Sequence, residues 1–306
     1  MTVNFNLAHT VAPGGKALEA SAKALNGKVY RTPINVTFKD GVNHVGVEQH
    51  ACTLCGDCCS GCNYGAKNTL IMNYLPDATN HGAEIYTRTA VRYVERAGGG
   101  WLVHYQLLDS GREAFDAPTL TVSADLVFIS AGTLGSTEIL LRSREKGLTT
   151  SDKLGQHMTG NGDVMAFGYN GDGVIDGIGY GHRDPKTMAP VGPCSTGVID
   201  LRGQPVLTDG MVIEEGSIPG ALGGFLPAGL AGASVIGGRE EEAGVASRLR
   251  QIGREAESLV GGPYVGAIKN TQTYLVMTHD DGNGRMYLAK DELRVDWPSV
   301  GRQQIF

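Results

Sequence analysis

Five of the six cysteines of this chain crowd into one short stretch, and this crowding constrains the fold more than any other feature of the sequence. The stretch, residues 49–75, reads QHACTLCGDCCSGCNYGAKNTLIMNYL. Small residues dominate its first half, and a polar run, Lys67 to Thr69, precedes an apolar end. A loop of this composition either packs its backbone closely against another part of the protein or presents its thiols to a shared ligand.

Four of these residues, Cys52, Cys55, Cys58 and Cys62, have the spacing C-x2-C-x2-C-x3-C of iron-sulfur proteins, so a [4Fe-4S] cluster is one interpretation. Two observations weigh against it, since the motif occurs once and Asn63 stands where bacterial ferredoxins have proline. A zinc site is disfavoured because two knuckles separated by ~12 to 20 residues are missing. We expect reduced thiols that pack as small side chains, with the cluster as the alternative.

The composition is that of an ordinary folded protein, with 306 residues, 41% of them hydrophobic and 19% charged. A net charge of -6 and the lack of a Lys/Arg run argue against nucleic acid as a partner. The first residues lack the basic start and apolar core of a signal peptide, so the cytoplasm is the expected location. The 45 glycines predict many tight turns.

The first half of the chain shows helix and strand patterns in a clear order. Residues 16–27 predict a helix and 29–38 an edge strand that contains a proline. Three strands follow at 83–95, 101–108 and 119–123, and the turns between them indicate an antiparallel meander. The apolar run LVFIS, residues 126–130, predicts a strand buried on both faces, followed by a small-residue turn and a helix over 138–144. Such a turn is typical of nucleotide sites, although many α/β proteins have one without a ligand.

The second half predicts further strands at 163–169, 195–202 and 211–215, and a hairpin that turns at residues 281–284. Residues 217–238 carry no charge but include seven glycines and two prolines, which disfavours a membrane span and favours a lid or a buried helix. Residues 239–260 predict a helix whose apolar face should be core. That face consists of Val245, Leu249, Ile252, Ala256 and Leu259.

Several motifs together resemble the glucose-methanol-choline (GMC) oxidoreductases, in particular their bacterial cholesterol-oxidase-like branch. They are CTLCGDCCSGCNYGAKNTL, AEIYTRTAVRYVE, ADLVFISAGTLGSTEILLRS and TGNGDV, within residues 49–170. The resemblance implies a fold of the α/β and α+β classes, with an incomplete Rossmann-like FAD-binding domain that carries the meander and a substrate domain built on an antiparallel sheet. We place these domains at residues 1–158 and 159–306.

The resemblance also implies a set of FAD contacts. In that family the strand matching AVRYV gives a backbone contact to adenine, here at Val91, and the turn with Ala131 and Gly132 lies along the FAD. The family motif around GAKNT approaches the flavin and the substrate, which points to Asn63 and Gly65.

Glu214 is the candidate catalytic base. It lies in a predicted strand just before the uncharged stretch, a position similar to that of a catalytic glutamate in steroid-oxidising relatives. In an apolar pocket the pKa of its carboxyl group would rise towards neutrality, which suits a general base. A surface carboxylate is the other interpretation of this residue.

Two departures from the family pattern qualify the resemblance. The chain has no G-x-G-x-x-G fingerprint for the pyrophosphate, and the family's catalytic histidine lies beyond the matching region. We therefore expect an internal portion of a longer flavoenzyme that lacks both family ends, with those N- and C-terminal portions as its partners. Such a portion by itself should hold FAD weakly.

The expected function is oxidation of a small apolar alcohol, such as a sterol-like one, by hydride transfer to FAD while a base removes the hydroxyl proton. The alternative is an iron-sulfur electron-transfer or binding module organised on the cysteine loop.

Overall fold

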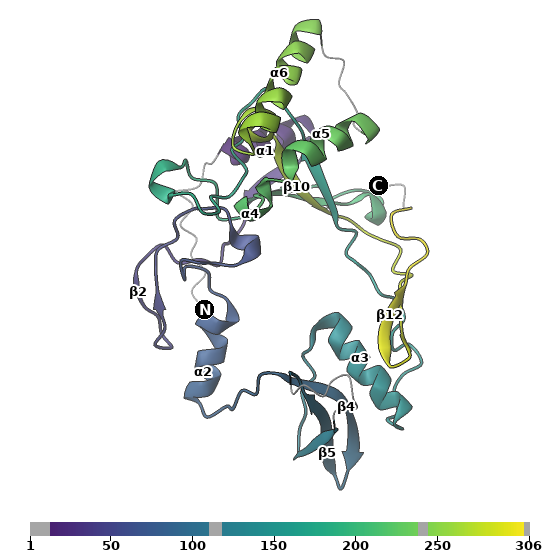
Figure 1. The fold of residues 1–306 in the computed structure, drawn as a ribbon. Coiled ribbons are helices and arrows are strands. Elements are labelled where there is room, and N and C mark those ends of the chain that lie inside the picture. The colour runs from purple at the N-terminus through teal and green to yellow at the C-terminus, as the bar shows by residue number, and fades with distance from the viewer. Residues whose placement is uncertain (1–12, 110–117, 238–243, 303–306) are drawn as a thin grey trace. The chain divides into compact units, whose positions relative to one another are not determined.

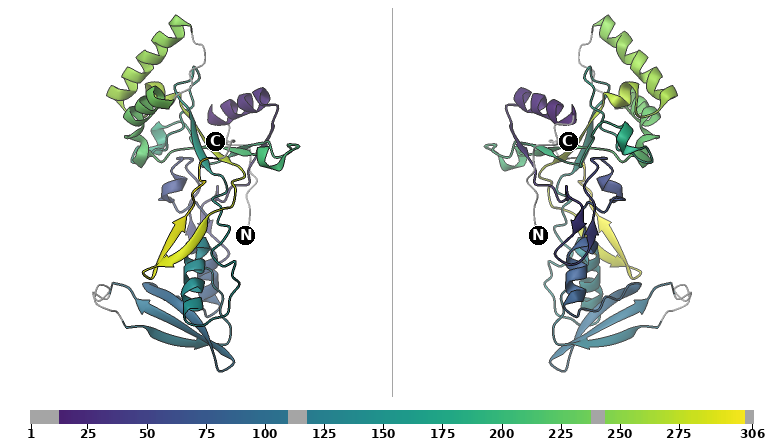
Figure 2. Two further views of the ribbon diagram at one scale, coloured as in Figure 1. Left: turned by 90° about the vertical axis from the view of Figure 1, so that its right-hand side faces the viewer. Right: turned by 90° about the vertical axis from the view of Figure 1, so that its left-hand side faces the viewer.

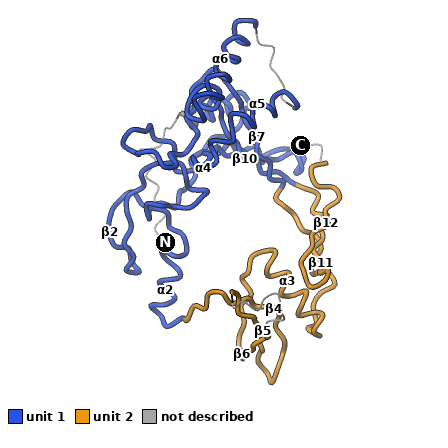
Figure 3. Tube along the Cα trace, viewed as in Figure 1, with its two compact units in different colours: residues 1–83, 162–279 blue, residues 84–161, 280–306 orange. Residues whose placement is uncertain are grey.

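The computed structural model describes residues 13–109, 118–237 and 244–302 (Figure 1). These residues form two compact units, and each unit combines two separate segments of the chain (Figure 3). Unit 1 contains residues 1–83 and 162–279, and unit 2 contains residues 84–161 and 280–306. The structure is a mixture of helices and antiparallel sheets, as the sequence predicts.

Unit 1 is built on a five-stranded sheet in which every pair of neighbouring strands is antiparallel. Its strands, in spatial order, are β1 (Lys28–Arg31), β8 (Gly197–Asp200), β9 (Val212–Gly216), β10 (Gln272–Met277) and β7 (Val164–Gly168). The edge position predicted for residues 29–38 is confirmed, but β1 ends before Pro33 because proline lacks the N–H that a ladder needs.

Helices cover both sides of this sheet (Figure 2). Helix α1 (Pro13–Ala24) lies on one side, where Leu18 and Ala22 pack against Ile199 of β8. On the other side lie α5 (Leu226–Gly237), α6 (Val245–Gly261) and α7 (Gly266–Lys269), and Ile268 of α7 joins Ile178 in a second buried cluster. The remaining elements of unit 1 are short. They are β2 (Gly41–Val42), β3 (Glu48–Gln49), α2 (Tyr74–Asn80), α4 (Gly220–Gly223) and 3-10 helices at Cys58–Ser60, Leu70–Met72, Pro185–Thr187 and Leu207–Asp209.

Unit 2 contains the predicted meander, with β4 (Thr89–Ala97), β5 (Gly100–Leu107) and β6 (Leu120–Ala124) in sequential antiparallel order. Helix α3 (Gly132–Glu145) packs on it, and the hairpin of β11 (Arg285–Ala289) and β12 (Glu292–Asp296) packs on the helix. The fully buried hydroxyl of Ser143 accepts the N–H of Val94 at 2.9 Å, which joins α3 to β4. Arg142 donates to the carboxylate of Asp291 at 2.7 Å, which joins α3 to the turn of the hairpin.

The buried strand predicted at 126–130 does not form. The segment has no regular structure, and Leu126 and Phe128 are 67% and 81% exposed. A strand buried on both faces needs hydrogen-bonded neighbours and covering layers, and within the described residues no strand pairs with this segment. The helix after it does form, and it begins at Gly132 rather than Glu138.

The helix predicted at 239–260 forms as α6, but its apolar face is not core. Leu249 is 66% exposed, and Val245, Ile252 and Leu259 are also exposed. Instead, the opposite, polar face of α6 packs against the rest of unit 1, where its side chains find hydrogen-bond partners. Ser258 donates to the carbonyl of Val265 at 2.7 Å, and Arg254 donates to Asn170 at 2.7 Å.

One further expectation differs from the structure. The hairpin near the C-terminal end turns at Lys290 and Asp291, whose positive φ angles of 53° and 61° suit a two-residue turn, and not at residues 281–284. The compact units combine segments from both sides of residue 158, because β11 and β12 pack on α3 within unit 2, and the expected domain boundary between 158 and 159 stays a prediction. The FAD-binding and substrate roles of the two sequence ranges stay predictions. Among the described helices, none has the length and apolar character that crossing a membrane requires.

The first testable consequence concerns the buried bond between α3 and β4. In Ser143→Ala the buried N–H of Val94 loses its acceptor, which lowers the free energy of unfolding. The higher helix propensity of alanine offsets a small part of this loss. The net decrease should be about 1–2 kcal/mol. Urea denaturation followed by circular dichroism measures this change. Ser123→Ala on the exposed surface of β6 is the control, and an equal effect of both variants would show that the bond contributes nothing.

Candidate functional site

The cysteine loop is attached to the rest of unit 1 by the carboxylate of Asp57. One of its oxygens accepts the N–H of Gly220 at 2.7 Å, and the other accepts the N–H of Gly181 at 2.9 Å. Gly220 is the first residue of α4, so the carboxylate also meets the positive end of that short helix. The sequence analysis did not select Asp57, because an aspartate between cysteines has no distinctive pattern of its own.

Close backbone packing completes this attachment. The carbonyl of Leu54 accepts the N–H groups of Val191 and Gly192 at 3.0 and 2.9 Å. A Cβ atom on Gly192 would lie 2.8 Å from the Cα of Gly56, and Gly56 itself has a positive φ of 76°. Both positions therefore require glycine. The small residues of the loop thus serve backbone contact, as the packing interpretation predicts.

A pocket of about 540 Å³ lies beside the loop. It brings together parts of unit 1 that are distant in sequence. These are residues 32–36, the cysteine loop with Lys67, the residues just before β8, and Glu214 of β9. Its lining residues are Thr32, Pro33, Ile34, Asn35, Val36, Cys58, Cys59, Lys67, Pro193, Cys194, Ser195 and Glu214. The first segment is held in place because Thr37 N–H donates to the carbonyl of Ala66 and Asn68 N–H to that of Asn35, both at 2.9 Å.

Glu214 is placed in this pocket by the centre of the sheet. It lies in β9, the middle strand, in register with Val198 of β8 and Leu275 of β10. Strands on both sides hold its backbone, so its position is rigid. The structure thus places the predicted base and the predicted cysteine loop at one site.

The other predicted site residues are distributed over both units. Asn63 is exposed and Gly65 is half-buried; they stand before Lys67, which is the member of the GAKNT motif that lines the pocket. Lys67 is fixed by donating to the carbonyl of Cys58 at 3.0 Å. Val91, Ala131 and Gly132 belong to unit 2. Residues 217–237, predicted as a lid or buried helix, form α4 and the half-exposed α5, and none of the residues that line this pocket comes from them.

Unit 2 presents backbone groups at the predicted FAD contacts. Helix α3 starts after Ala131 without a side-chain cap, and Gly132 has a positive φ of 70° with open space around its Cα. The ladder between β4 and β5 shifts register between Val91 and Tyr93, and such a bulge leaves backbone groups outside the ladder. Both features suit contact with a ligand through main-chain atoms.

The four motif cysteines are free thiols that lie near one another. Burial, together with the neighbouring Cys58, Cys55 and Cys62, raises the pKa of Cys52 to about 11. Burial also raises the pKa of Cys58. Metal ligation requires thiolates, and in the part of the chain that the structure describes no group of three or more His, Cys, Asp or Glu residues could hold a metal ion. The cluster alternative gains no support from this geometry, and the reduced state of the thiols stays a prediction.

A buried carboxylate next to Glu214 was missed by the sequence analysis. Glu215 is only 7% exposed, its side chain accepts a hydrogen bond from Thr196, and burial raises its pKa. Because successive residues of a strand point to opposite faces, Glu214 and Glu215 have different surroundings. Alternation in MVIEEG could have indicated that one of the two glutamates is buried.

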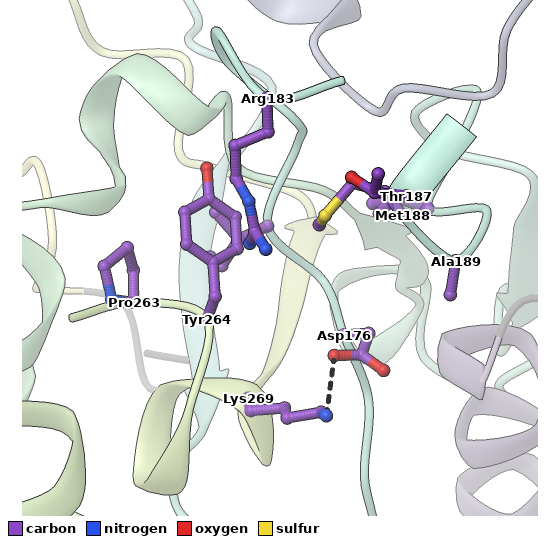
Figure 4. A pocket seen from close by; sticks show the side chains of 10 residues that line it. Asp176, Arg183, Thr187, Met188, Ala189, Pro263, Tyr264 and Lys269 are labelled. Carbon is purple, nitrogen blue, oxygen red and sulfur yellow. Dashed lines mark ion pairs between the residues drawn. The ribbon is translucent and has the colours of Figure 1, made fainter. Parts of the chain in front are cut away.

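A second, smaller pocket of about 200 Å³ lies elsewhere in unit 1 (Figure 4). Asp176 and Lys269 form an ion pair of 3.8 Å at one side of it, and the guanidinium of Arg183 lies 4.1 Å from the ring centroid of Tyr264 at another. Its charged groups already have partners, so the pocket beside the cysteine loop is the better candidate site.

Comparison with known proteins places this geometry in a family context. Residues 7–159, half of the chain, match the family model described as GMC oxidoreductase. A cholesterol oxidase of Acinetobacter baumannii is 32% identical over 164 residues, which are 51% of this chain and 28% of that relative. A cholesterol oxidase of Mycobacterium tuberculosis is 37% identical over 103 residues, 33% of this chain and 17% of the relative.

The similarity extends further along the chain in another relative. An uncharacterized GMC-type oxidoreductase of Mycobacterium tuberculosis is 26% identical over 289 residues, which are 94% of this chain and 38% of the relative. The chain thus spans between 17% and 38% of the length of these three proteins.

The attachment of the loop can be tested at Asp57. Asp57→Ala removes the acceptor of two backbone N–H groups, so the free energy of unfolding should fall by about 1–3 kcal/mol. Asp57→Asn keeps one acceptor oxygen and should lose less. Guanidinium denaturation measures both changes, with exposed Asp209→Ala as the control. Equal stability of Asp57→Ala and the unmodified protein would show that the loop is held by other contacts.

The raised pKa of Glu215 predicts a pH dependence of stability. The folded state favours the protonated carboxyl of Glu215. The stability that this protonation adds to the folded protein is complete below the ordinary pKa of 4.5 and is lost as the pH rises through the pKa of the folded state. Glu215→Gln stays neutral and should therefore gain stability relative to the unmodified protein between pH 4 and pH 8. Denaturation midpoints across this range measure the gain, with exposed Glu257→Gln as the control. Parallel pH curves for the two proteins would contradict a buried, proton-binding Glu215.

Proposed function

Because the chain belongs to the glucose-methanol-choline oxidoreductase family, we propose that it serves the FAD-dependent oxidation of an apolar alcohol. The observation that carries the proposal is the position of Glu214, which lines one pocket together with Lys67 of the GAKNT motif and the cysteine loop. The activity of the longer relatives supports the reaction class, since two of them are cholesterol oxidases.

The pocket has a lining suited to an apolar substrate with one polar group. Pro33, Ile34, Val36 and Pro193 supply apolar surface, and Glu214 supplies a carboxylate oxygen as acceptor. About 540 Å³ lies within the ~300–1,000 Å³ of small-molecule sites. A sterol-like alcohol is therefore the proposed substrate class.

Glu214 is the proposed general base. Its carboxylate would accept the hydroxyl proton of the alcohol as the bond to carbon is oxidised, and the flanking strands would keep it aligned for this transfer.

The proposed FAD contacts of this chain are main-chain groups of unit 2. The N–H of Ala131 donates to Ser136 at 3.0 Å, so the start of α3 at Gly132 is the part that offers donors to an anionic or polar edge, and the bulge that follows Val91 offers backbone groups to a purine. Bound FAD would supply the hydride acceptor, which no side chain of the protein can replace. The residues of this chain would bind and orient the alcohol and the cofactor, and Glu214 would accept the hydroxyl proton.

The adjacent glutamates of β9 provide a matched test of the proposed base. With the purified protein assayed in saturating FAD, Glu214→Gln should lower turnover of a 3-hydroxysterol by about 10²- to 10⁴-fold, because the hydroxyl proton then has no acceptor. An artificial electron acceptor such as a phenazine dye gives the readout. Glu215→Gln, one residue away on the opposite face, should change turnover less than a few-fold.

The reversed result, with a loss in Glu215→Gln and none in Glu214→Gln, would assign the base to the buried carboxylate. Unchanged turnover in both variants would remove β9 from the chemistry. The flavin absorbance of each variant must equal that of the unmodified protein, so that a difference in turnover reports on proton transfer and not on lost cofactor.

A further inference from the structure

Two thiols from distant parts of the sequence lie next to each other in the pocket that contains Glu214. The Sγ atoms of Cys59 and Cys194 are 3.6 Å apart, although 135 residues separate them in the sequence. Cys59 belongs to the 3-10 helix of the cysteine loop, and Cys194 lies three residues before β8. We propose that Cys59 and Cys194 form a reversible disulfide, which makes the loop a site of oxidative modification.

The backbone on both sides of these thiols is fixed close to them. Val191 and Gly192 donate to the carbonyl of Leu54, and Gly192 packs directly against Gly56. The two segments therefore stay together in the folded protein. A disulfide bond is ~2.05 Å long, so the two sulfurs need to approach by about 1.5 Å, which side-chain rotation supplies.

The two thiols differ in their access to solvent. Cys59 is exposed, whereas Cys194 is half-buried with its sulfur 3.7 Å from the carbonyl oxygen of Ser217. A dissolved oxidant therefore meets Cys59 first, and Cys194 is placed to react second. Cys58 is next to Cys59 in the chain and competes with Cys59 as the disulfide partner of Cys194.

With hydrogen peroxide as the oxidant the reaction balances in two steps. The sulfur of Cys59 attacks one peroxide oxygen, the O–O bond breaks, and Cys59 becomes a sulfenic acid while the other oxygen leaves as water with the thiol proton. The sulfur of Cys194 then attacks the sulfur of Cys59, the S–O bond breaks, and a second water leaves with the proton of Cys194. The two thiols lose two electrons in total, and the peroxide gains them.

The link would join the cysteine loop covalently to the segment that leads into β8, and both segments line the pocket. Oxidation would hold this wall of the pocket in place, and reduction by a small thiol would release it. The proposal rests on the contact of the two sulfurs and does not depend on flavin chemistry.

Peptide mapping tests the disulfide directly. The full chain is treated with hydrogen peroxide, alkylated, and digested with trypsin without reduction. All five loop cysteines lie in the peptide 40–67, and Cys194 is the one cysteine of the peptide 187–202. We expect these two peptides to be cross-linked, the number of free thiols to fall from six to four, and dithiothreitol to reverse both changes.

Variants and fragmentation identify the bond. The cross-link should vanish in Cys59→Ser and Cys194→Ser and persist in Cys58→Ser and Cys52→Ser, and fragmentation of the cross-linked peptides from the unmodified protein should locate it even if a variant fails to fold. Loss of the link in Cys58→Ser with persistence in Cys59→Ser would overturn the assignment. So would oxygen addition to Cys59 without a cross-link, or six thiols left after treatment.

Discussion

The candidate site depends on the two hydrogen bonds that the carboxylate of Asp57 accepts. They tie the cysteine loop to the segments at Gly181 and Gly220 of unit 1. The loop needs such bonds, together with those of Leu54 to Val191 and Gly192, because its own regular structure is limited to short 3-10 turns. The charge of the carboxylate makes these bonds stronger than neutral ones. One side chain thus organises a loop that has little structure of its own.

The central strand of the sheet gives two adjacent glutamates different surroundings. Glu214 and Glu215 have the same chemistry, but the alternation of a strand gives one the pocket and the other a buried position against Thr196. A rigid central strand is a suitable place for a proton acceptor, since neighbours on both sides remove backbone freedom. The burial of Glu215 makes its ionisation costly, which is a local conflict of the kind often found beside functional sites.

The thiols show how spacing along the chain and proximity in space can disagree. The four cysteines with iron-sulfur spacing lie near one another, yet no metal-binding group forms among the described residues. The sulfur that lies against the loop comes from Cys194, which is remote in sequence. The spacing argument concerned the cysteines of the loop and did not include the sixth cysteine. The packing of Gly56 against Gly192 and the hydrogen bonds of Val191 and Gly192 to Leu54 bring the two segments together.

The sequence by itself determined the local elements, the small-residue character of the loop and the family. Helix α1, the meander and the strand with Glu214 were predictable because their patterns reflect local periodicity and turn chemistry. The tertiary structure decided which surfaces became buried. Residues 126–130 and the apolar face of α6 have core composition but are exposed, because burial needs a partner that a periodic pattern cannot specify. The roles of Asp57 and Cys194 were likewise decided by contacts across more than 120 residues, and no local signal in the sequence encodes such contacts.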